Sequence, residues 1–338
     1  MSLCDESQVI IKNKKIFTNQ NILFSGNVQD EIFLFFKNVK NKLHIRQIHN
    51  ENILKSFPKK NICFRILPKK EFISNCTTLI FFWMRNKIES KFQLTYLISI
   101  MNINQKIFIV GRKKFGIKSI VKFLKNWIVC KKIDYRKKCI LYYGINTTSK
   151  VFVFKKFIKQ YSINNIKITT LPGVFDYKGI DKGSLLMIST FQKSNIIGNV
   201  LEIGSGSGIL SIILKKIFPK TQITLIDNNS TAILCSKYNL KNNKINGAVL
   251  YSNIYSKIKK KFHLIISNPP THYGIHNNNS IIYKIIKNAK KFLYKNGKIR
   301  IVVHSYISCK NLLKNIFGNY KIIKNDNHFN IYESIFIT

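Results

Sequence analysis

A glycine-rich turn between an apolar strand and the start of a helix is the feature that most constrains the fold of this chain. Residues 200–211 read VLEIGSGSGILS. Glycines lack a Cβ, so together with the backbone amides of a helix N-terminus they let a polar ligand lie against the main chain. Dinucleotide-binding folds use the spacing G-x-G-x-x-G, but here Ile209 occupies the last position and the third glycine, Gly208, comes one residue earlier. The pattern E-x-G-x-G-x-G, in which Glu202 ends the strand, is typical of enzymes that bind S-adenosylmethionine.

Polar residues also follow three further predicted strands of the second half. The strand after the glycine-rich segment ends at Asp227, about 20 residues beyond the turn, where an acid meets ribose hydroxyls in this architecture. The third and fourth strands are followed by Asn253 and Asn268. Because ligands of open α/β sheets bind at the carboxyl ends of the strands, we expect Glu202 and these three residues to lie at one edge of a sheet.

Asn268, Pro269 and Pro270 form the second informative motif. The lone pair of an exocyclic amine is delocalised into its base, so an enzyme that methylates the amine must hold the NH2 group with the lone pair aimed at the methyl donor. The Asn268 side-chain oxygen and the Pro269 carbonyl could each accept one N–H, and the prolines stiffen the loop that carries them. An isolated Asn-Pro-Pro is more often a plain turn. Its position after the fourth strand, in a chain that also has Glu202 and Asp227, favours catalysis on bases or on protein glutamine.

The second half has the pattern of a doubly wound α/β sheet. Repeated strand–helix units are followed by a terminal hairpin, which predicts a mostly parallel sheet with one antiparallel strand. A helix from about residue 280 to 294 is expected to stop at Asn296 and Gly297, a favourable C-cap.

The first half alternates strand-like and helical segments in the same way. Residues 106–120 again read as strand, glycine turn and helix, but three cations fill the turn at residues 112–114 and would repel a sulfonium. We therefore expect an α/β unit without a cofactor site, although an unrelated α/β domain with a chance glycine turn fits nearly as well. A polar break after a basic, aromatic stretch places the domains at residues 1–163 and 164–338.

The charge of the chain points to a polyanionic partner. Its 338 residues include 57 Lys and Arg against 14 Asp and Glu, a formal net charge of +43. Cations that neutralise phosphates release counterions, which favours binding to nucleic acid. The chain is also rich in Ile, Lys, Asn and Phe, whose codons are rich in A and T, so genome composition alone would raise its lysine content. The net charge therefore supports a nucleic-acid partner but identifies no particular patch.

The cysteines and the apolar segments indicate in which cellular compartment the protein is expected. The seven cysteines are scattered and form no C-x-x-C pair, which argues against a disulfide framework or a zinc site and for a reducing compartment. The first residues, MSLCDESQ, lack the basic and apolar regions of a signal peptide. Dense apolar runs such as LIFFWM at residues 79–84 are too short to span a bilayer. We expect a cytoplasmic protein with no membrane segment and no bound metal.

Several motifs, taken together, resemble one known family. In the second half they are LPGVF at 171–175, GIDKGS at 179–184, the glycine-rich segment and IISNPP at 265–270. In the first half they are ILFSGNVQD at 22–30, WMRNK at 83–87, FQL at 92–94 and FIVG at 108–111. Over nearly its whole length the chain is similar to the RsmC family, the bacterial 16S ribosomal RNA (guanine-N2)-methyltransferases, here from an A+T-rich genome. The resemblance implies two tandem Rossmann-like class I methyltransferase domains, of which only the second binds cofactor.

The resemblance also implies an activity and a set of site residues. The enzyme would methylate N2 of one guanine of 16S rRNA within assembled 30S subunits, as a monomer, with S-adenosylmethionine as cofactor. The residues that line the methionine and ribose parts of the cofactor would be Glu202, Gly204, Ser205, Gly206 and Gly208. Asp227 would hold the ribose hydroxyls, Asn253 would lie near the adenine, and Asp181 would border the cofactor. Asn268 with the two prolines would hold the target amine.

One departure from the family pattern concerns the target base. The family has an aromatic residue after N-P-P that stacks on the flipped base, whereas this chain has Thr271. His272 or Tyr273 could supply the ring instead. His263 and His304 flank strands and are expected to be packing or surface residues rather than catalysts.

Three alternatives stay open at the level of the sequence. They are an enzyme of the same fold that methylates guanine N2 in 23S rRNA, a non-catalytic rRNA-binding assembly factor, and a protein-glutamine methyltransferase. The first is separated from the 16S enzyme only by the motifs of the first half. The intact Glu202, Asp227 and Asn268 argue against the second, and the basic composition argues against the third.

Overall fold

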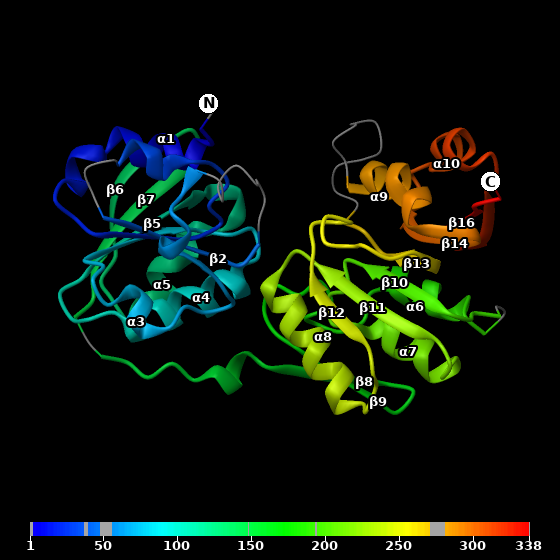
Figure 1. The fold of residues 1–338 in the computed structure, drawn as a ribbon. Helices are drawn as coiled ribbons and strands as arrows, with labels where there is room; N and C mark the ends of the chain where they lie inside the picture. Colours follow the sequence, from blue (N-terminus) through cyan, green and yellow to red (C-terminus); the bar gives the residue numbers. More distant parts are fainter. Residues whose placement is uncertain are drawn as a thin grey trace. The chain divides into compact units, whose positions relative to one another are not determined.

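The computed structural model describes residues 3–36, 40–47, 56–147, 149–192, 195–270 and 281–337. The chain divides into two compact units, Met1–Phe157 and Ile158–Thr338 (Figure 1). The expected boundary after residue 163 falls between the two strands of a hairpin, β8 (Lys159–Ile163) and β9 (Ile166–Thr170). Since these strands pair with each other, the whole hairpin belongs to the second unit.

The second unit is built on a seven-stranded sheet with the strand order β12-β11-β10-β13-β14-β16-β15. The strands are β10 (Asn199–Ile203), β11 (Gln222–Asp227), β12 (Ala248–Tyr251), β13 (Phe262–Ser267), β14 (Leu293–His304), β15 (Lys321–Asn325) and β16 (Phe329–Ile335). Strands β10 to β14 run parallel, and β16 pairs antiparallel with both β14 and β15. The predicted doubly wound sheet, with one reversed strand and a closing hairpin, is confirmed.

Helices cover both faces of this sheet. They are α6 (Lys182–Ser189), α7 (Ile209–Ile217), α8 (Ser230–Asn242), α9 (Ile281–Ala289), α10 (Lys310–Phe317) and the 3-10 turn η7 (Lys290–Phe292). Successive residues of a strand point to opposite faces. Val200 accordingly belongs to one core with side chains of α6 and α7, and Leu201 belongs to a second core with side chains of α9 and α10. Burial on both faces explains why the central strands are continuously apolar.

The segment before β14 differs from expectation. Helix α9 ends at Ala289 and β14 already begins at Leu293, so Asn296 and Gly297 lie inside a strand and do not cap a helix. The Asn296 amide donates to the Phe336 carbonyl at 2.7 Å, and the Phe336 amide donates to the Gly297 carbonyl at 2.8 Å. Asn296 does adopt the left-handed conformation of a cap residue, with φ +63°. The left-handed conformation of Asn296 thus accompanies backbone pairing with Phe336 and not the end of a helix.

The first unit repeats the same topology with the strand order β3-β2-β1-β4-β5-β7-β6. Its strands are β1 (Ile22–Gly26), β2 (Asn41–Ile45), β3 (Ile62–Phe64), β4 (Thr78–Phe82), β5 (Lys106–Arg112), β6 (Lys131–Arg136) and β7 (Cys139–Ile145). Its helices are α1 (Asp5–Lys12), α3 (Lys70–Ile73), α4 (Lys87–Ile100) and α5 (Ile120–Leu124), with 3-10 turns at Lys14–Phe17, Ile32–Phe35, Lys59–Asn61, Lys113–Phe115, Ile117–Ser119 and Phe154–Phe157. Strand for strand, β1 takes the place of β10 and β4 the place of β13, so the expected tandem arrangement is confirmed.

This equivalence corrects one comparison made from the sequence. The strand and turn at residues 106–120 include β5, which takes the place of β14 and not that of the strand before the glycine-rich turn. The true counterpart is the end of β1, where Gly26 has φ +87°. A Cβ on Gly26 would collide with the carbonyl oxygen of Phe82. The backbone of β4 therefore closes the space beside β1.

Side chains fill the carboxyl edge of the first sheet. Trp83 and Met84 directly follow β4 and are buried, at the position where the second unit has Asn268 after β13. Arg46 follows β2 and forms a buried ion pair with Glu89 of α4. Apolar and ion-paired groups thus take the place in which the second unit carries its polar site residues.

The described ranges contain neither a membrane-spanning helix nor a cluster of metal ligands. Within them, none of the helices combines the length and the apolar character needed to cross a bilayer. The same part of the chain contains no group of three or more His, Cys, Asp or Glu placed to hold a metal ion. All seven cysteines are free thiols.

Candidate active site

The three glycines of the turn after β10 all adopt left-handed conformations but have different surroundings. Gly204, Gly206 and Gly208 have φ values of +75°, +55° and +82°. A Cβ on Gly204 would meet no atom of the described residues within 4 Å, so the main chain there is open to them. A Cβ on Gly208 would lie 3.0 Å from Leu225 Cδ2 and 3.3 Å from Ser236 Oγ. Gly208 therefore lets α7 start close to β11 and α8, whereas Gly204 leaves room for a ligand.

Glu202, the last residue but one of β10, holds the start of α7 in place. It is only 2% exposed, and its Oε2 accepts the backbone N–H of Ser211 at 3.1 Å. Burial raises the pKa of Glu202 to about 8, against the opposing effect of the Ser211 hydrogen bond. This carboxyl group thus fixes the geometry of the turn by holding the helix N-terminus against the strand.

Ser205 is turned toward α8. Its buried Oγ lies 3.1 Å from Ser236 Oγ, and Ser236 Oγ donates to the carbonyl of Gly206 at 3.0 Å. With its side chain engaged in this way, Ser205 can offer a ligand its backbone rather than its hydroxyl.

Asp227 and Asn253 follow neighbouring strands at the same edge. Asp227 Oδ2 accepts the Gly206 amide at 3.1 Å, and its Oδ1 accepts the Asn229 amide at 2.9 Å, so this half-buried carboxylate is oriented by the turn. In the β11–β12 register Asp227 pairs with Tyr251, two residues before Asn253. The fold therefore brings together the residues that the sequence predicts for the ribose and the adenine.

Asn268 is held by the first turn of α6. Its Nδ2 donates to both carboxylate oxygens of Asp181, each at 3.2 Å, and to Ser184 Oγ at 2.9 Å. Asp181 also caps α6, because its Oδ1 accepts the amides of Gly183 and Ser184 at 3.0 and 3.2 Å. An ionised carboxylate can only accept hydrogen bonds, so the NH2 end of Asn268 must face Asp181 and its oxygen must face away.

Asn268 lines a pocket of about 310 Å³ that carries several aromatic rings. Its lining residues are Phe175, Asp181, Lys182, Asn268, Pro269, Pro270, His304, His328 and Phe329. Phe175 is 69% exposed. The His304 ring stacks on Phe329 with centroids 4.5 Å apart and on Tyr306 at 5.2 Å. The pocket thus pairs the Asn-Pro-Pro motif with flat apolar surfaces.

Two family models match the chain. "Methyltransferase small domain N-terminal" covers residues 7–161 and "Methyltransferase small domain" covers residues 165–333. The ribosomal RNA small subunit methyltransferase C of Buchnera aphidicola subsp. Acyrthosiphon pisum (strain APS) is 42% identical, over 99% of this chain and 100% of the relative. The protein of the same name from Erwinia tasmaniensis is 32% identical, over 97% and 96%. The chain belongs to the ribosomal RNA small subunit methyltransferase C family. The resemblance found in the motifs is thereby confirmed.

A solved structure of another methyltransferase has the same fold as this chain. The Thermus thermophilus 16S rRNA N2 G1207 methyltransferase (RsmC), in complex with AdoMet and guanosine, superposes with a TM-score of 0.80 and covers 94% of this chain and 88% of its own. Sequence identity is 14%, so the likeness concerns the fold. The match extends over both units, as two tandem domains of one topology require.

Carboxylates gather around the glycine turn of this family member although acids are scarce in the chain. Asp176, Asp181, Glu202 and Asp227 are four of its 14 Asp and Glu residues, and the electrostatic influence of Asp176 and Asp227 reaches Glu202. Asp176 is 6% exposed and accepts hydrogen bonds from Tyr161 Oη at 2.5 Å and from Ser207 Oγ. Burial raises the pKa of Asp176, and among the described residues its Oδ1 has no hydrogen-bond partner. Acidic side chains are thus concentrated around the turn of an otherwise strongly basic protein.

The sequence missed several residues of the pocket. His304, the last residue of β14, lines the pocket and stacks on another of its rings, Phe329. His263 lies near the start of β13, away from the pocket, and its Nδ1 accepts the Asn199 amide at 3.0 Å. Phe175 lies in the LPGVF motif, which was the available signal, but nothing local indicates that it faces Asn268. The residues proposed for base stacking after the second proline, 271–273, lie outside the described part of the chain.

Proposed function

We propose that this chain transfers a methyl group from S-adenosylmethionine to the N2 amine of a guanine in 16S rRNA. The observation that carries the proposal is the orientation of Asn268, whose amide oxygen faces away from Asp181 at the edge of an open pocket. The names of the relatives support ribosomal RNA of the small subunit, and the T. thermophilus enzyme was solved with AdoMet and guanosine. These names favour the small subunit over 23S rRNA.

The residues around the turn suit S-adenosylmethionine. The open main chain at Gly204 would give the cofactor a surface to lie on, and Asp227 and Asn253, which follow neighbouring strands, would contact the ribose and the adenine. The carboxylates of Asp176 and Asp181 complement a ligand that carries a sulfonium and an ammonium group. When bound, this cofactor supplies an electrophilic methyl group.

The chemistry requires positioning rather than a strong base. The Asn268 oxygen and the Pro269 carbonyl would each accept one N–H of the amine, which aims the nitrogen lone pair at the methyl carbon. A bound cofactor would supply the methyl group and keep the electron pair of its broken C–S bond. The nitrogen held by Asn268 and Pro269 would lose one proton to water, so no strong base is needed. Asp181 acts as a positioning residue, because it decides which end of Asn268 faces the substrate.

Phe175 would stack on the target base. Phe175 is 69% exposed, whereas Phe329, the other phenylalanine of the pocket, is half-buried. Phe175 would supply the stacking ring that Thr271 lacks. Base–aromatic stacking contributes about 1–3 kcal/mol, so Phe175→Ala should raise the KM for rRNA by about tenfold or more, while Phe175→Tyr should retain the wild-type value. Equal KM values for all three proteins would contradict this assignment.

The first unit would support binding to assembled 30S subunits without taking part in catalysis, and the protein would act as a monomer. The collision that a Cβ on Gly26 would make with Phe82, and the buried Arg46–Glu89 pair, support the absence of a second cofactor site. The first unit would therefore bind RNA, because its surface lysines can neutralise backbone phosphates.

The decisive experiment incubates the whole chain with methyl-labelled S-adenosylmethionine and unmodified 30S or 50S subunits. Digestion to nucleosides should place the label in N2-methylguanosine, and only in the 30S reaction. Label in 50S rRNA, label in protein, or rRNA that binds without being methylated would each overturn the proposal in favour of a different substrate or of a non-catalytic assembly factor.

A further inference from the structure

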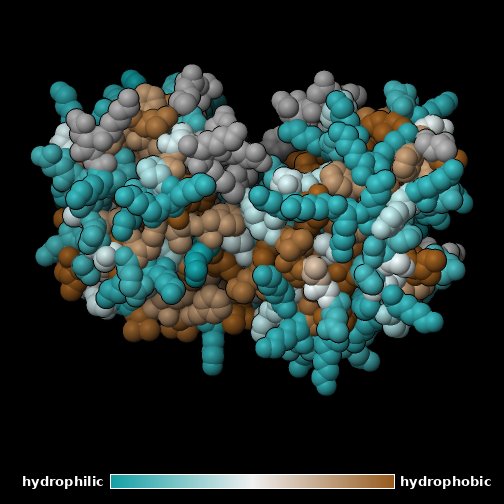
Figure 2. All heavy atoms as spheres, in the orientation of Figure 1, coloured by the Kyte–Doolittle hydropathy of each residue, from teal (hydrophilic) through white to brown (hydrophobic). Residues whose placement is uncertain are grey.

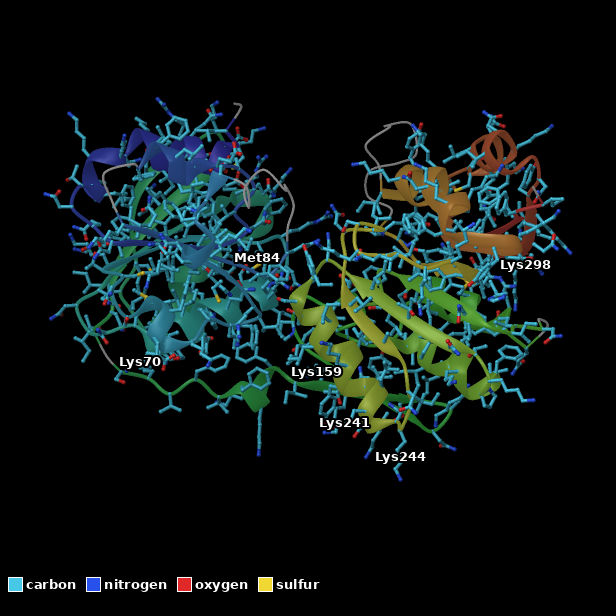
Figure 3. All side chains as sticks on the ribbon, in the orientation of Figure 1. Lys70, Met84, Lys159, Lys241, Lys244 and Lys298 are labelled. Carbon is cyan, nitrogen blue, oxygen red and sulfur yellow. The ribbon has the colours of Figure 1, made fainter. Side chains whose placement is uncertain are left out.

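A cavity of about 690 Å³ lies in the second unit, away from the site described above. Five cations and one carboxylate line it: Lys295, Lys298, Arg300, Lys321, Lys324 and Glu333. They come from β14, β15 and β16, and Figure 3 labels Lys298 beside β14. We call this group the basic cavity.

The single carboxylate of the basic cavity is already engaged. Glu333 accepts from Arg300 Nη2 at 2.6 Å and from Arg300 Nε at 3.0 Å, and Lys298 Nζ lies 3.9 Å from its other oxygen. Arg300 is only 3% exposed, and its Nη1 donates to Thr190 at 2.9 Å. In the described part of the chain, no carboxylate lies within salt-bridge distance of Lys295, Lys321 or Lys324. At least three positive charges of the cavity are therefore uncompensated.

General lysine enrichment does not account for this arrangement. Hydrophilic side chains are spread over the visible surface of both units (Figure 2), so exposed lysine alone singles out no region. A concave site lined by one sign of charge focuses the electrostatic potential more strongly than a convex surface does. Like charges in such a site also repel one another unless an anion lies between them. The basic cavity thus fits an anionic ligand.

The position of the basic cavity relates it to the proposed active site. Residues 298, 300, 302 and 304 of β14 point to one face, and the strand runs from Lys298 at the cavity to His304 at the Asn268 pocket. Six residues of strand span about 20 Å. Helix α6 lies along the same face, with Asp181 at the pocket and Ser189 at the cavity. A few nucleotides of single-stranded RNA can bridge the two sites.

We propose that the basic cavity binds backbone phosphate of the rRNA strand a few nucleotides from the target guanine. The inference rests on the proposed function for the identity of the RNA, but the anion site itself does not depend on methyl transfer. Phosphate contacts of this kind set the register of a nucleic acid without reading its sequence. The basic cavity would therefore help to decide which guanine reaches Asn268.

The test compares two variants that lose the same charge. One carries Lys295→Gln, Lys321→Gln and Lys324→Gln. The control carries Lys167→Gln, Lys237→Gln and Lys241→Gln, three exposed lysines on β9 and α8. Helix α8 contacts β9, β11 and β12, at the edge of the sheet opposite to β15. Both are titrated with a fluorescein-labelled single-stranded RNA oligonucleotide at increasing KCl concentration, and S-adenosylmethionine binding is measured by calorimetry to verify folding.

The cavity variant should bind the RNA at least about tenfold more weakly at low salt, and its slope of log affinity against log salt should fall by about 0.7 for each lost phosphate contact. The control should stay close to the wild type. Equal losses in both variants, or no loss in the cavity variant, would overturn the proposal. If the wild type binds RNA through the cavity but transfers no methyl group, the proposed function fails and the phosphate site stands.

A second arm separates RNA phosphate from a free anion. Inorganic phosphate is added to the wild-type protein–RNA complex at ionic strength matched with KCl. If the cavity binds the RNA backbone, phosphate should displace RNA no better than chloride does. Displacement at low phosphate concentration that is lost in the cavity variant would instead assign a small-anion site and overturn the RNA assignment.

Discussion

At the scale of single residues, the orientation of Asn268 is the most consequential feature. Asn268→Ala removes the acceptor that holds the target amine, so kcat should fall by about 10²–10³, the loss seen when one preorganised dipole of an active site is deleted. Affinity for S-adenosylmethionine should be retained, because the contacts of the Asn268 side chain are with Asp181 and Ser184 rather than with the glycine turn. Single-turnover methylation of 30S subunits and calorimetry measure the two quantities. Full activity in the variant would refute the role.

Asp181 offers a companion variant that separates positioning from helix capping. Asn is as good an N-cap as Asp, so Asp181→Asn should leave the melting temperature almost unchanged. The new side chain carries one acceptor oxygen and one NH2 donor, so Asn268 can meet it with either end. Only Ser184 then favours the original orientation of Asn268, and kcat should drop. Asp181→Ala should lower both kcat and, by about 1 kcal/mol, stability. An Asp181→Asn protein with wild-type kcat would show that Asp181 only caps α6.

The buried Glu202 carboxyl predicts how stability depends on pH. Its pKa is about 8 in the folded chain, against 4.5 for the free group. Between these values the folded state holds a proton that the unfolded state has lost, so the free energy of unfolding falls as pH rises from 5 to 8, by at most about 1.4 kcal/mol per pKa unit of the shift. Glu202→Gln removes this dependence while its oxygen can still accept from Ser211. Between pH 5 and pH 8 the melting temperature of the wild type should fall more than that of the variant. An equal change in both proteins would contradict the pKa assigned to Glu202.

The sequence identifies Glu202, Asp227 and Asn268 because each lies at or directly after the carboxyl end of an apolar strand. It could not find the contact between Asn268 and Asp181, which lie 87 residues apart and meet only because α6 lies over β14 and β16. For the same reason Phe175 and His304 were not recognised as neighbours of one pocket. Local patterns show which residues lie at the edge of a sheet, and tertiary packing decides which of them touch.

At the scale of elements, replacing two glycines of the turn should have different effects, one mainly on cofactor affinity and the other mainly on stability. Gly204→Ala and Gly208→Ala both place a Cβ on a left-handed residue, which costs about 1–2 kcal/mol. Gly208→Ala also pushes a methyl group against Leu225 and Ser236, which should add about 1–3 kcal/mol of overpacking. Gly204→Ala instead extends into open space and should lower the affinity for S-adenosylmethionine more than the melting temperature. Calorimetric titration and thermal unfolding of both variants check this contrast; the reverse ranking would mean that the open side of the turn lies at Gly208.

The two element-level errors of the sequence reading have one cause. Asn296 and Gly297 form a left-handed signal that fits a helix C-cap and a kink inside a strand equally well, and the pairing with Phe336 that decides between them is about 40 residues distant. Likewise, an apolar strand followed by glycine occurs at both β1 and β5, so the local pattern could not say which one corresponds to β10. The order of strands in the sheet, which is a tertiary property, resolves both.

At the scale of the whole molecule, the chain contains one topology twice. Among the described residues, only the second copy combines open main chain with polar side chains at the carboxyl edge of its sheet. Each unit has its own sheet and its own core. We therefore predict that the fragment 158–338 folds alone and binds S-adenosylmethionine with the affinity of the whole chain, while methylating 30S subunits poorly. Calorimetry should detect no binding to the fragment 1–157. Binding to that fragment, or its loss from 158–338 when the fragment is folded, would contradict the division of roles.

A shorter fragment, 164–338, tests where the boundary between the units lies. It lacks β8, so β9 loses its pairing partner and Asp176 loses the hydrogen bond from Tyr161 Oη. Leaving a buried acceptor with one partner fewer costs about 1–3 kcal/mol, and Asp176 lies beside the glycine turn, 3.6 Å from the position of a Cβ on Gly206. The shorter fragment should therefore melt at a lower temperature than 158–338 and bind S-adenosylmethionine more weakly. Fragments of equal stability and affinity would place the boundary at residue 163, and the β8–β9 hairpin would then be a linker rather than part of the catalytic unit.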